Sequence, residues 1–190
     1  MTLRSTLRST SLAAALAAGA TLAHSAGFEL ASPTIKPGSM LSDAQVFNGF
    51  GCTGKNISPT LKWSGAPKDT KSYAVTVYDP DAPTGSGWWH WVVYNIPASA
   101  NELPEGAGGA DGKGLPAGSV QGRTDFGAPG FGGACPPPGD KPHRYVFTVF
   151  ALKTDKLDIP ADGSAALVGY MVNANKIGSA TFTAKYGRKK

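Results

Sequence analysis

Three runs of β-forming residues, set apart by glycine and proline, constrain the fold more than any other feature of this sequence. The runs cover residues 72–79, 88–96 and 144–152, and aromatic and β-branched side chains dominate all three. Glycine and proline supply 25 and 15 of the 190 residues and cluster between short apolar segments. Short apolar segments separated by glycine and proline are typical of a β-dominated protein. The sequence therefore predicts a mainly β fold in which the three runs are strands.

Helical periodicity is confined to one segment near the C-terminus. Residues 164–177 carry apolar side chains at three- and four-residue spacing, which predicts an amphipathic helix. Asp162 or Ser164 can cap its N-terminus. Residues 181–186 then predict a final strand.

The first 26 residues have the pattern of an export signal. Arg4 and Arg8 precede an uncharged, alanine-rich stretch over residues 12–23, and small residues that a signal peptidase recognises follow. The alternative is a membrane anchor, but an apolar core of 12 residues is shorter than the roughly 20 that span a bilayer. We therefore expect cleavage near residues 23–26, a single domain over residues 27–190, a periplasmic or secreted location, and no stable membrane insertion of the mature chain.

The charge balance argues against nucleic-acid binding. The net charge is +5, and it falls to +3 once Arg4 and Arg8 leave with the signal. The sequence has no stripe of lysine and arginine of the kind that follows a phosphate backbone. We expect no nucleic-acid partner.

Cys52 and Cys135 are the only cysteines in the sequence. An even count in an exported chain permits one disulfide, which would close a loop of more than 80 residues. Two unpaired buried thiols are the alternative, which an oxidising compartment disfavours. Two cysteines so far apart are a poor zinc signature, so no metal site is expected.

Two carboxylates follow the first predicted strand, in the sequence Asp79-Pro-Asp81-Ala-Pro. Residues two apart share a strand face, but the prolines force an irregular turn, so the two side chains can point in different directions. The simpler interpretation is that both aspartates only stabilise a proline turn. A functional interpretation depends on the histidines.

Both histidines beyond the predicted signal lie in or at a predicted strand. His90 lies within the aromatic segment 88–91, and His143 stands at the entrance of the third run. A lone strand histidine is more often packed and hydrogen-bonded than functional. Here both can reach a pocket shared with the aspartates, and an aspartate that accepts a hydrogen bond from a histidine ring fixes its tautomer and favours its charged form. That arrangement suits a phosphate, and we expect both His90 and His143 to donate hydrogen bonds to its oxygens.

A long glycine-rich region, residues 98–142, separates the second and third runs. Only residues 119–123 within it suggest a strand, and an irregular segment of this length inside a domain is usually functional or disordered. Its last part, residues 130–139, combines glycine with proline, which predicts exposed backbone N–H groups that can form a nest for an anion. It fits neither a P-loop nor a dinucleotide fingerprint.

Four longer motifs resemble the bacterial branch of the phosphatidylethanolamine-binding (Raf-kinase-inhibitor-like) family in order and spacing, over nearly all of the chain after the signal. They are YDPDAP (78–83), GWWHWVVYNIP (87–97), GACPPPGDKPHRYVFTVFAL (133–152) and ATFTAKYGR (180–188). The resemblance implies a β-sandwich-like fold with a large central sheet and one or two short helices, one of them near the C-terminus. It also implies a small pocket near one end that binds phosphate-bearing head groups.

The resemblance also names the residues of that pocket. Carried over by motif position, the ligand-binding residues are Asp79, Asp81, His90, Pro137, His143 and Tyr145. Trp88, Trp91 or Tyr145 would supply apolar wall. Cys135 stands where eukaryotic members usually have glycine, and a disulfide to Cys52 would tie the pocket loop to the segment around that residue and narrow or stiffen the site.

The expected function is a binding module for a small anion, either phosphate or a phospholipid head group, with no catalytic residue and no cofactor. The alternative is a metal-assisted or acid/base hydrolase that uses His90, His143, Asp79 and Asp81. No nucleophile-elbow or zinc-protease motif is present to name such a reaction. A third interpretation is modulation of a partner protein through the pocket rim, and the tryptophan-rich strand could serve a homodimer interface.

Overall fold

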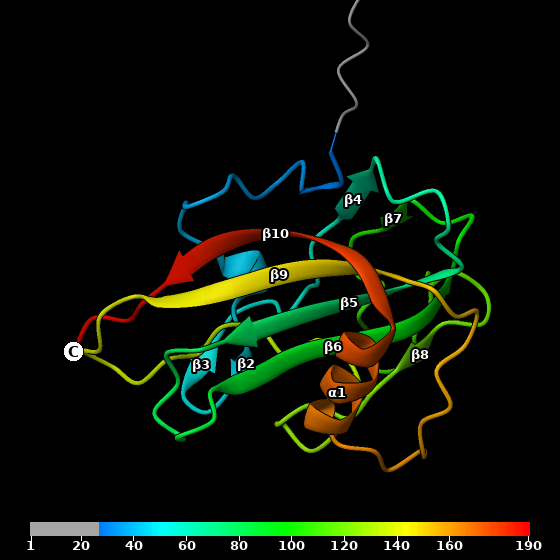
Figure 1. Ribbon diagram of the computed structural model, residues 1–190. Coiled ribbons are helices and arrows are strands. Elements are labelled where there is room, and N and C mark those ends of the chain that lie inside the picture. Colours follow the sequence, from blue (N-terminus) through cyan, green and yellow to red (C-terminus); the bar gives the residue numbers. More distant parts are fainter. Residues whose placement is uncertain (1–26) are drawn as a thin grey trace, which may run out of the picture.

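The computed structural model describes residues 27–190, and its main feature is a five-stranded antiparallel sheet (Figure 1). The strand order is β10-β9-β5-β6-β8. The strands are β5 (Ser72–Asp79), β6 (Trp88–Pro97), β8 (Val120–Gln121), β9 (His143–Leu152) and β10 (Lys176–Tyr186). The predicted export signal, residues 1–26, lies outside the described residues.

The three predicted central strands are confirmed, and the final strand is longer than predicted. β5, β6 and β9 cover the three β-forming runs, and their ends differ from the predicted ones by at most one residue. β10 begins at Lys176, directly after the helix, instead of at Thr181. Its first residues are mostly exposed and contain a register irregularity before Gly178, so they lack the alternation that marks a strand in a sequence.

One α-helix, α1 (Ala165–Asn175), packs on one face of the central sheet, near the C-terminus as predicted. Ser164, one of the two candidate caps, accepts a hydrogen bond from the Leu167 N–H at 3.1 Å. A single 3-10 turn, η1 (Asp43–Gln45), is the other helical element within the described part of the chain. Within residues 27–190 no helix has the length and apolar character needed to cross a bilayer.

Two smaller sheets complete the fold, and the sequence predicted neither. The first has the order β1-β4-β7, with β1 (Glu29–Ala31), β4 (Leu61–Ser64) and β7 (Glu102–Leu103). The second is a hairpin of β2 (Asn48–Gly49) and β3 (Cys52–Thr53). These strands have two to four residues, which is too short for a period to be recognised in a sequence.

The main core lies between the central sheet and the three-stranded sheet. Strands from both sheets share one buried cluster, which includes Leu61, Trp63, Val75, Val77, Trp91, Leu103 and Phe147. Helix α1 covers the opposite face of the central sheet, where Val168 and Val172 pack with Val92 and Tyr94. Because both faces are covered, β5 is buried along nearly its whole length, and the predicted mainly β class with a large central sheet is confirmed.

Antiparallel pairing brings distant chain segments together at one end of the central sheet. Asp79, the last residue of β5, pairs with Trp88, the first residue of β6. β9 is the other neighbour of β5 and begins at His143, so Asp79 and His143 meet across a separation of 64 positions. This end of the sheet carries the candidate site.

A disulfide ties the β2–β3 hairpin to the segment that precedes β9. Cys52 and Cys135 are bonded, with Cα atoms 6.0 Å apart, so the pairing expected from the sequence is present. Cys135 also lines the cavity described below. The hairpin is therefore held against the site by a covalent bond.

Replacing both cysteines, in Cys52→Ser/Cys135→Ser, is expected to lower the free energy of unfolding by about 4 kcal/mol. The disulfide spans a sequence separation of 83, and closing so long a loop restricts the unfolded chain. Urea titration of the oxidised protein and of the double variant measures the difference, and reduced wild-type protein should match the variant. A loss below about 1 kcal/mol would show that the disulfide is not a stabilising restraint.

Candidate ligand-binding site

A cavity of about 170 Å³ lies at the end of the sheet where β5 stops and β6 and β9 begin. Five of the six residues predicted to bind a ligand line it, namely Asp79, His90, Pro137, His143 and Tyr145. The two histidines thus share one cavity, which is the arrangement that the sequence interpretation required. The sixth residue, Asp81, has a different role.

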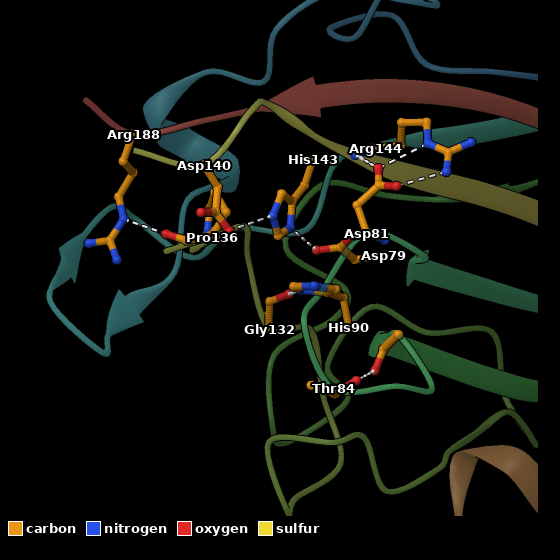
Figure 2. A network of polar contacts seen from close by, with 11 residues as sticks. Asp79, Asp81, Thr84, His90, Gly132, Pro136, Asp140, His143, Arg144 and Arg188 are labelled. Atoms are coloured by element: carbon orange, nitrogen blue, oxygen red, sulfur yellow. Dashed lines mark hydrogen bonds and ion pairs between the residues drawn. The ribbon is translucent and has the colours of Figure 1, made fainter. Parts of the chain in front are cut away.

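A buried hydrogen bond between Asp79 and His143 lies at the centre of the site (Figure 2). His143 Nδ1 is 2.8 Å from Asp79 Oδ2, and each side chain is only 4% exposed. The second carboxylate oxygen, Asp79 Oδ1, accepts the Asp81 N–H at 2.8 Å. Because a carboxylate only accepts, a proton sits on Nδ1, and Nε2 of His143 is left for another interaction.

A second carboxylate approaches the opposite side of the His143 ring. Asp140 Oδ2 lies 3.5 Å from Nε2, and the Asp140 side chain is 45% exposed. A contact this long and this exposed to water is weak. An incoming anion could therefore take the place of Asp140 at Nε2.

His90 is held in a single tautomer by the loop that precedes β9. Its Nδ1 lies 2.8 Å from the Gly132 carbonyl oxygen, which can only accept, so Nδ1 carries the proton. Burial lowers the pKa of His90, although the hydrogen bond to Gly132 opposes this effect. His90 is therefore neutral with an unprotonated Nε2, which differs from the expectation that both histidines donate to an anion.

Two hydrogen-bond donors at the cavity have no acceptor among residues 27–190. They are the hydroxyl group of Tyr145 and the indole N–H of Trp88, and both atoms are buried. Burial, followed by the negative charge of Asp79, raises the pKa of Tyr145, so the phenol keeps its proton. Buried donors nearly always have a partner in native proteins, and both of these belong to residues that line the cavity, which makes them candidates for contact with a ligand.

Asp81 does not line the cavity, because the proline turn directs its carboxylate away from that of Asp79. Asp81 instead pairs with Arg144, whose Nε and Nη2 donate to its two oxygens at 2.9 and 2.7 Å. The Arg144 backbone N–H donates a third bond at 2.8 Å. These bonds make Asp81 a structural link between the turn after β5 and the first residues of β9.

Most amides of the glycine-rich segment before β9 are bonded within the protein, which leaves few of them for the predicted anion nest. The N–H groups of Gly132, Gly133 and Ala134 donate to His90 O, Asn56 Oδ1 and Gln45 O. The glycines serve close packing: a Cβ atom at Gly132 would lie 2.2 Å from the Phe126 ring. Pro137 lines the cavity, and Arg188 Nε donates to the neighbouring Pro136 carbonyl at 2.6 Å.

The apolar wall differs in part from the prediction. Trp88 and Tyr145 line the cavity as expected, whereas Trp91 is fully buried in the main core and donates to Gln121. Phe50 and Phe126 form much of the wall, and the sequence analysis missed both. Each is a large apolar residue flanked by glycine or polar residues in an irregular segment, which was the one signal available.

The Asp79–His143 pair could also serve acid/base chemistry, since a carboxylate that orients an imidazole is common to many hydrolases. Among residues 27–190 no group of three or more histidine, cysteine or carboxylate side chains is arranged to hold a metal ion. The geometry of the pair suits proton transfer and anion binding alike.

The fold and the site define a mainly β protein with a small, polar-centred cavity at one end of its central sheet. The chain matches the family model described as phosphatidylethanolamine-binding protein over residues 31–187. It therefore belongs to the phosphatidylethanolamine-binding protein family, as the motifs predicted.

Three relatives illustrate the match. The chain is 62% identical to the Escherichia coli protein YbcL over 164 residues, which covers 86% of this chain and 90% of YbcL. The crystal structure of YbcL, described as a member of the mammalian PEBP family, has a TM-score of 0.84 and covers 86% of this chain and 100% of that one. E. coli YbhB is 49% identical over 158 residues, with coverage of 83% and 99%. A homologue from Chlamydia trachomatis, at 27% identity, has a TM-score of 0.69 with coverage of 86% and 99%.

Asp81→Asn is expected to destabilise the protein near neutral pH but not in strong acid. The hydrogen bonds from Arg144 lower the pKa of Asp81 to about 2 from its ordinary 3.8. A carboxyl group whose pKa is lowered by folding stabilises the fold above its unfolded pKa, and this contribution is lost as the pH falls through the folded value. Urea unfolding at about pH 5, 3.5 and 2 should thus show a wild-type advantage that shrinks with acid.

Asp162→Asn is the matched control for that series, because Asp162 is exposed and precedes α1. Its effect should stay small at every pH. A difference between wild type and Asp81→Asn that stays constant down to about pH 2 would contradict the assigned ion pair.

Proposed function

We propose that this chain binds a small phosphate-bearing anion in the cavity at the end of the central sheet. The observation that carries the proposal is a pair of buried donors, Tyr145 Oη and Trp88 Nε1, that have no acceptor among residues 27–190 and belong to residues lining the same cavity as His143. Leaving a buried donor unpaired costs about 1–3 kcal/mol, so an acceptor brought by a ligand is favoured there. Phosphate oxygens are strong acceptors of this kind.

The size of the cavity supports a head-group-sized ligand. Its volume of about 170 Å³ is below the range of roughly 300–1,000 Å³ that is usual for drug-sized ligands. A phosphate with a short substituent matches this space better than a whole lipid does. Few atoms are available for contacts, so we expect modest affinity.

Asp79 gives His143 its role in the proposal. In the imidazolium form His143 donates Nδ1–H to Asp79 and can donate Nε2–H to the anion. His90 has a different role in the proposal, because its neutral ring packs in the wall of the cavity. Tyr145 contacts this ring edge-on, with 5.1 Å between the ring centroids.

The family description adds the ligand class. Phosphatidylethanolamine-binding proteins are named for a phospholipid head group, and a phosphate ester of that size is the ligand proposed for this chain.

We further propose that the chain acts outside the cytoplasm, because residues 1–26 have the pattern of an export signal and the disulfide is typical of an oxidising compartment. Modulation of a partner protein through the pocket rim remains a prediction.

Tyr145→Phe is expected to weaken binding of inorganic phosphate about 10- to 100-fold, because one hydrogen bond to a charged group contributes about 1.5–3 kcal/mol. Isothermal titration calorimetry measures the affinity. The melting temperature should stay the same or rise, since the variant removes a buried hydroxyl group that has no partner in the described part of the chain. Tyr170→Phe on α1, where the side chain is 70% exposed, is the matched control and should bind as wild type does.

Equal affinity in wild type and Tyr145→Phe would contradict the proposed role of the cavity. Titration with phosphoethanolamine in the same calorimeter tests the hydrolase alternative. Release of inorganic phosphate during the titration would favour acid/base chemistry by the Asp79–His143 pair over simple binding.

Sulfate binding should weaken from about pH 6 to about pH 8, because histidine is the side chain that ordinarily changes charge in that interval. Sulfate is the probe because a phosphate ester changes its own charge near pH 6. His143→Gln tests whether this ring is responsible, because the glutamine side chain does not titrate. We expect a loss of about 10- to 100-fold in wild type and none in His143→Gln. A wild-type affinity that does not change with pH would exclude a charged donor.

A further inference from the structure

An exposed phenylalanine stands at the tip of the β2–β3 hairpin, beside the mouth of the cavity. Phe50 lines the cavity although its side chain is 69% exposed. Its φ is 51°, a left-handed backbone conformation that bulky residues rarely adopt. Both neighbours, Gly49 and Gly51, are glycine, which adopts such angles freely, so a phenyl group at this position goes against the local backbone preference. Strained residues of this kind gather at functional sites.

Two links fix the tip of the hairpin relative to the cavity. Cys52 is bonded to Cys135, which lines the cavity. Arg188 bridges the hairpin and the proline segment, since Nη1 donates to the Gly51 carbonyl at 3.0 Å and Nε donates to the Pro136 carbonyl at 2.6 Å. The disulfide and the Arg188 guanidinium group fix the hairpin that carries Phe50. Its exposed ring is therefore preorganised for contact with a bound ligand.

The Phe50 ring continues a row of aromatic rings that starts inside the cavity. Phe126 packs edge-on against Trp88, with 5.4 Å between ring centroids. Phe50 then stacks with Phe126, with centroids 5.9 Å apart and planes inclined by 15°. Phe47 supports both rings from the side, at 5.5 Å from Phe50 and 4.5 Å from Phe126. We call Phe50 and Phe126 the aromatic rim.

We propose that the aromatic rim is a subsite for a flat, uncharged apolar group esterified to the bound phosphate, and that Phe50 determines this preference. The inference rests on the proposed function, because the phosphate must occupy the cavity for its substituent to reach the rim. Stacking and edge-on contacts favour a flat ring against Phe50 and Phe126. A cationic substituent fits less well, since the Arg188 guanidinium group already lies at the hairpin, with Nη1 on the Gly51 carbonyl.

The test compares inorganic phosphate, phenyl phosphate and phosphocholine by calorimetry on wild type and Phe50→Gly. Glycine accepts the left-handed backbone at position 50 without strain, so the variant should keep the backbone of the hairpin, and circular dichroism checks that it is folded. We expect wild type to bind phenyl phosphate about 3- to 10-fold more tightly than phosphate, the range of one aromatic contact. In Phe50→Gly that preference, measured as the ratio of the two affinities within the same protein, should fall to nearly none.

Tyr170→Ala on α1 is the control for loss of an exposed aromatic ring, and its preference for phenyl phosphate should match wild type. An equal preference in wild type and Phe50→Gly, or no preference in wild type, would overturn the aromatic rim and leave phosphate binding intact. Phosphocholine bound more tightly than phenyl phosphate would overturn it too, since the rim would then recognise a cation. Failure of wild type to bind any of the three probes would remove the proposed function and the subsite together.

Discussion

The candidate site depends on the buried hydrogen bond between Asp79 and His143. It joins the last residue of β5 to the first residue of β9, so the hydrogen bond is lost if the two strand ends separate. Removing one partner would leave the other buried polar group without its hydrogen bond, which costs about 1–3 kcal/mol. The same bond fixes the ring of His143 and leaves Nε2 for a ligand. The same hydrogen bond thus stabilises the strand ends and sets the geometry of the site.

Most polar groups around this pair bond to other parts of the protein, and two donors have no such partner in the described chain. Most N–H groups of the glycine-rich segment before β9 donate hydrogen bonds within the protein, and the Gly132 carbonyl accepts one from His90. Asp81 binds Arg144 and stabilises the turn from outside the cavity. Tyr145 and Trp88 keep donors that nothing in the described chain accepts. Most polar groups around the cavity are therefore bonded within the described chain, and these two donors are the ones that we propose to meet the anion.

The sequence predicted the parts of the molecule that have a long or chemically distinct pattern. The three central strands, the C-terminal helix and the meeting of His90 and His143 follow from apolar runs and from motifs. The strands of the smaller sheets are too short to show a period. The direction of the Asp81 side chain depends on the prolines of its turn, and the tautomer of His90 depends on a carbonyl 42 positions away. Phe50 and the bonded loop amides also required coordinates, because only tertiary packing decides which face of a loop meets the cavity.

The most direct test of this arrangement is nitrogen-15 NMR of the two imidazole rings while inorganic phosphate is added. Nδ1 of His143 should stay protonated throughout because Asp79 accepts from it, and the Nε2 signal of the same ring should move as phosphate saturates the protein. His90 should keep a protonated Nδ1 and an unprotonated Nε2. A His143 Nε2 signal that remains unchanged at saturation would contradict the proposed contact between this ring and the anion.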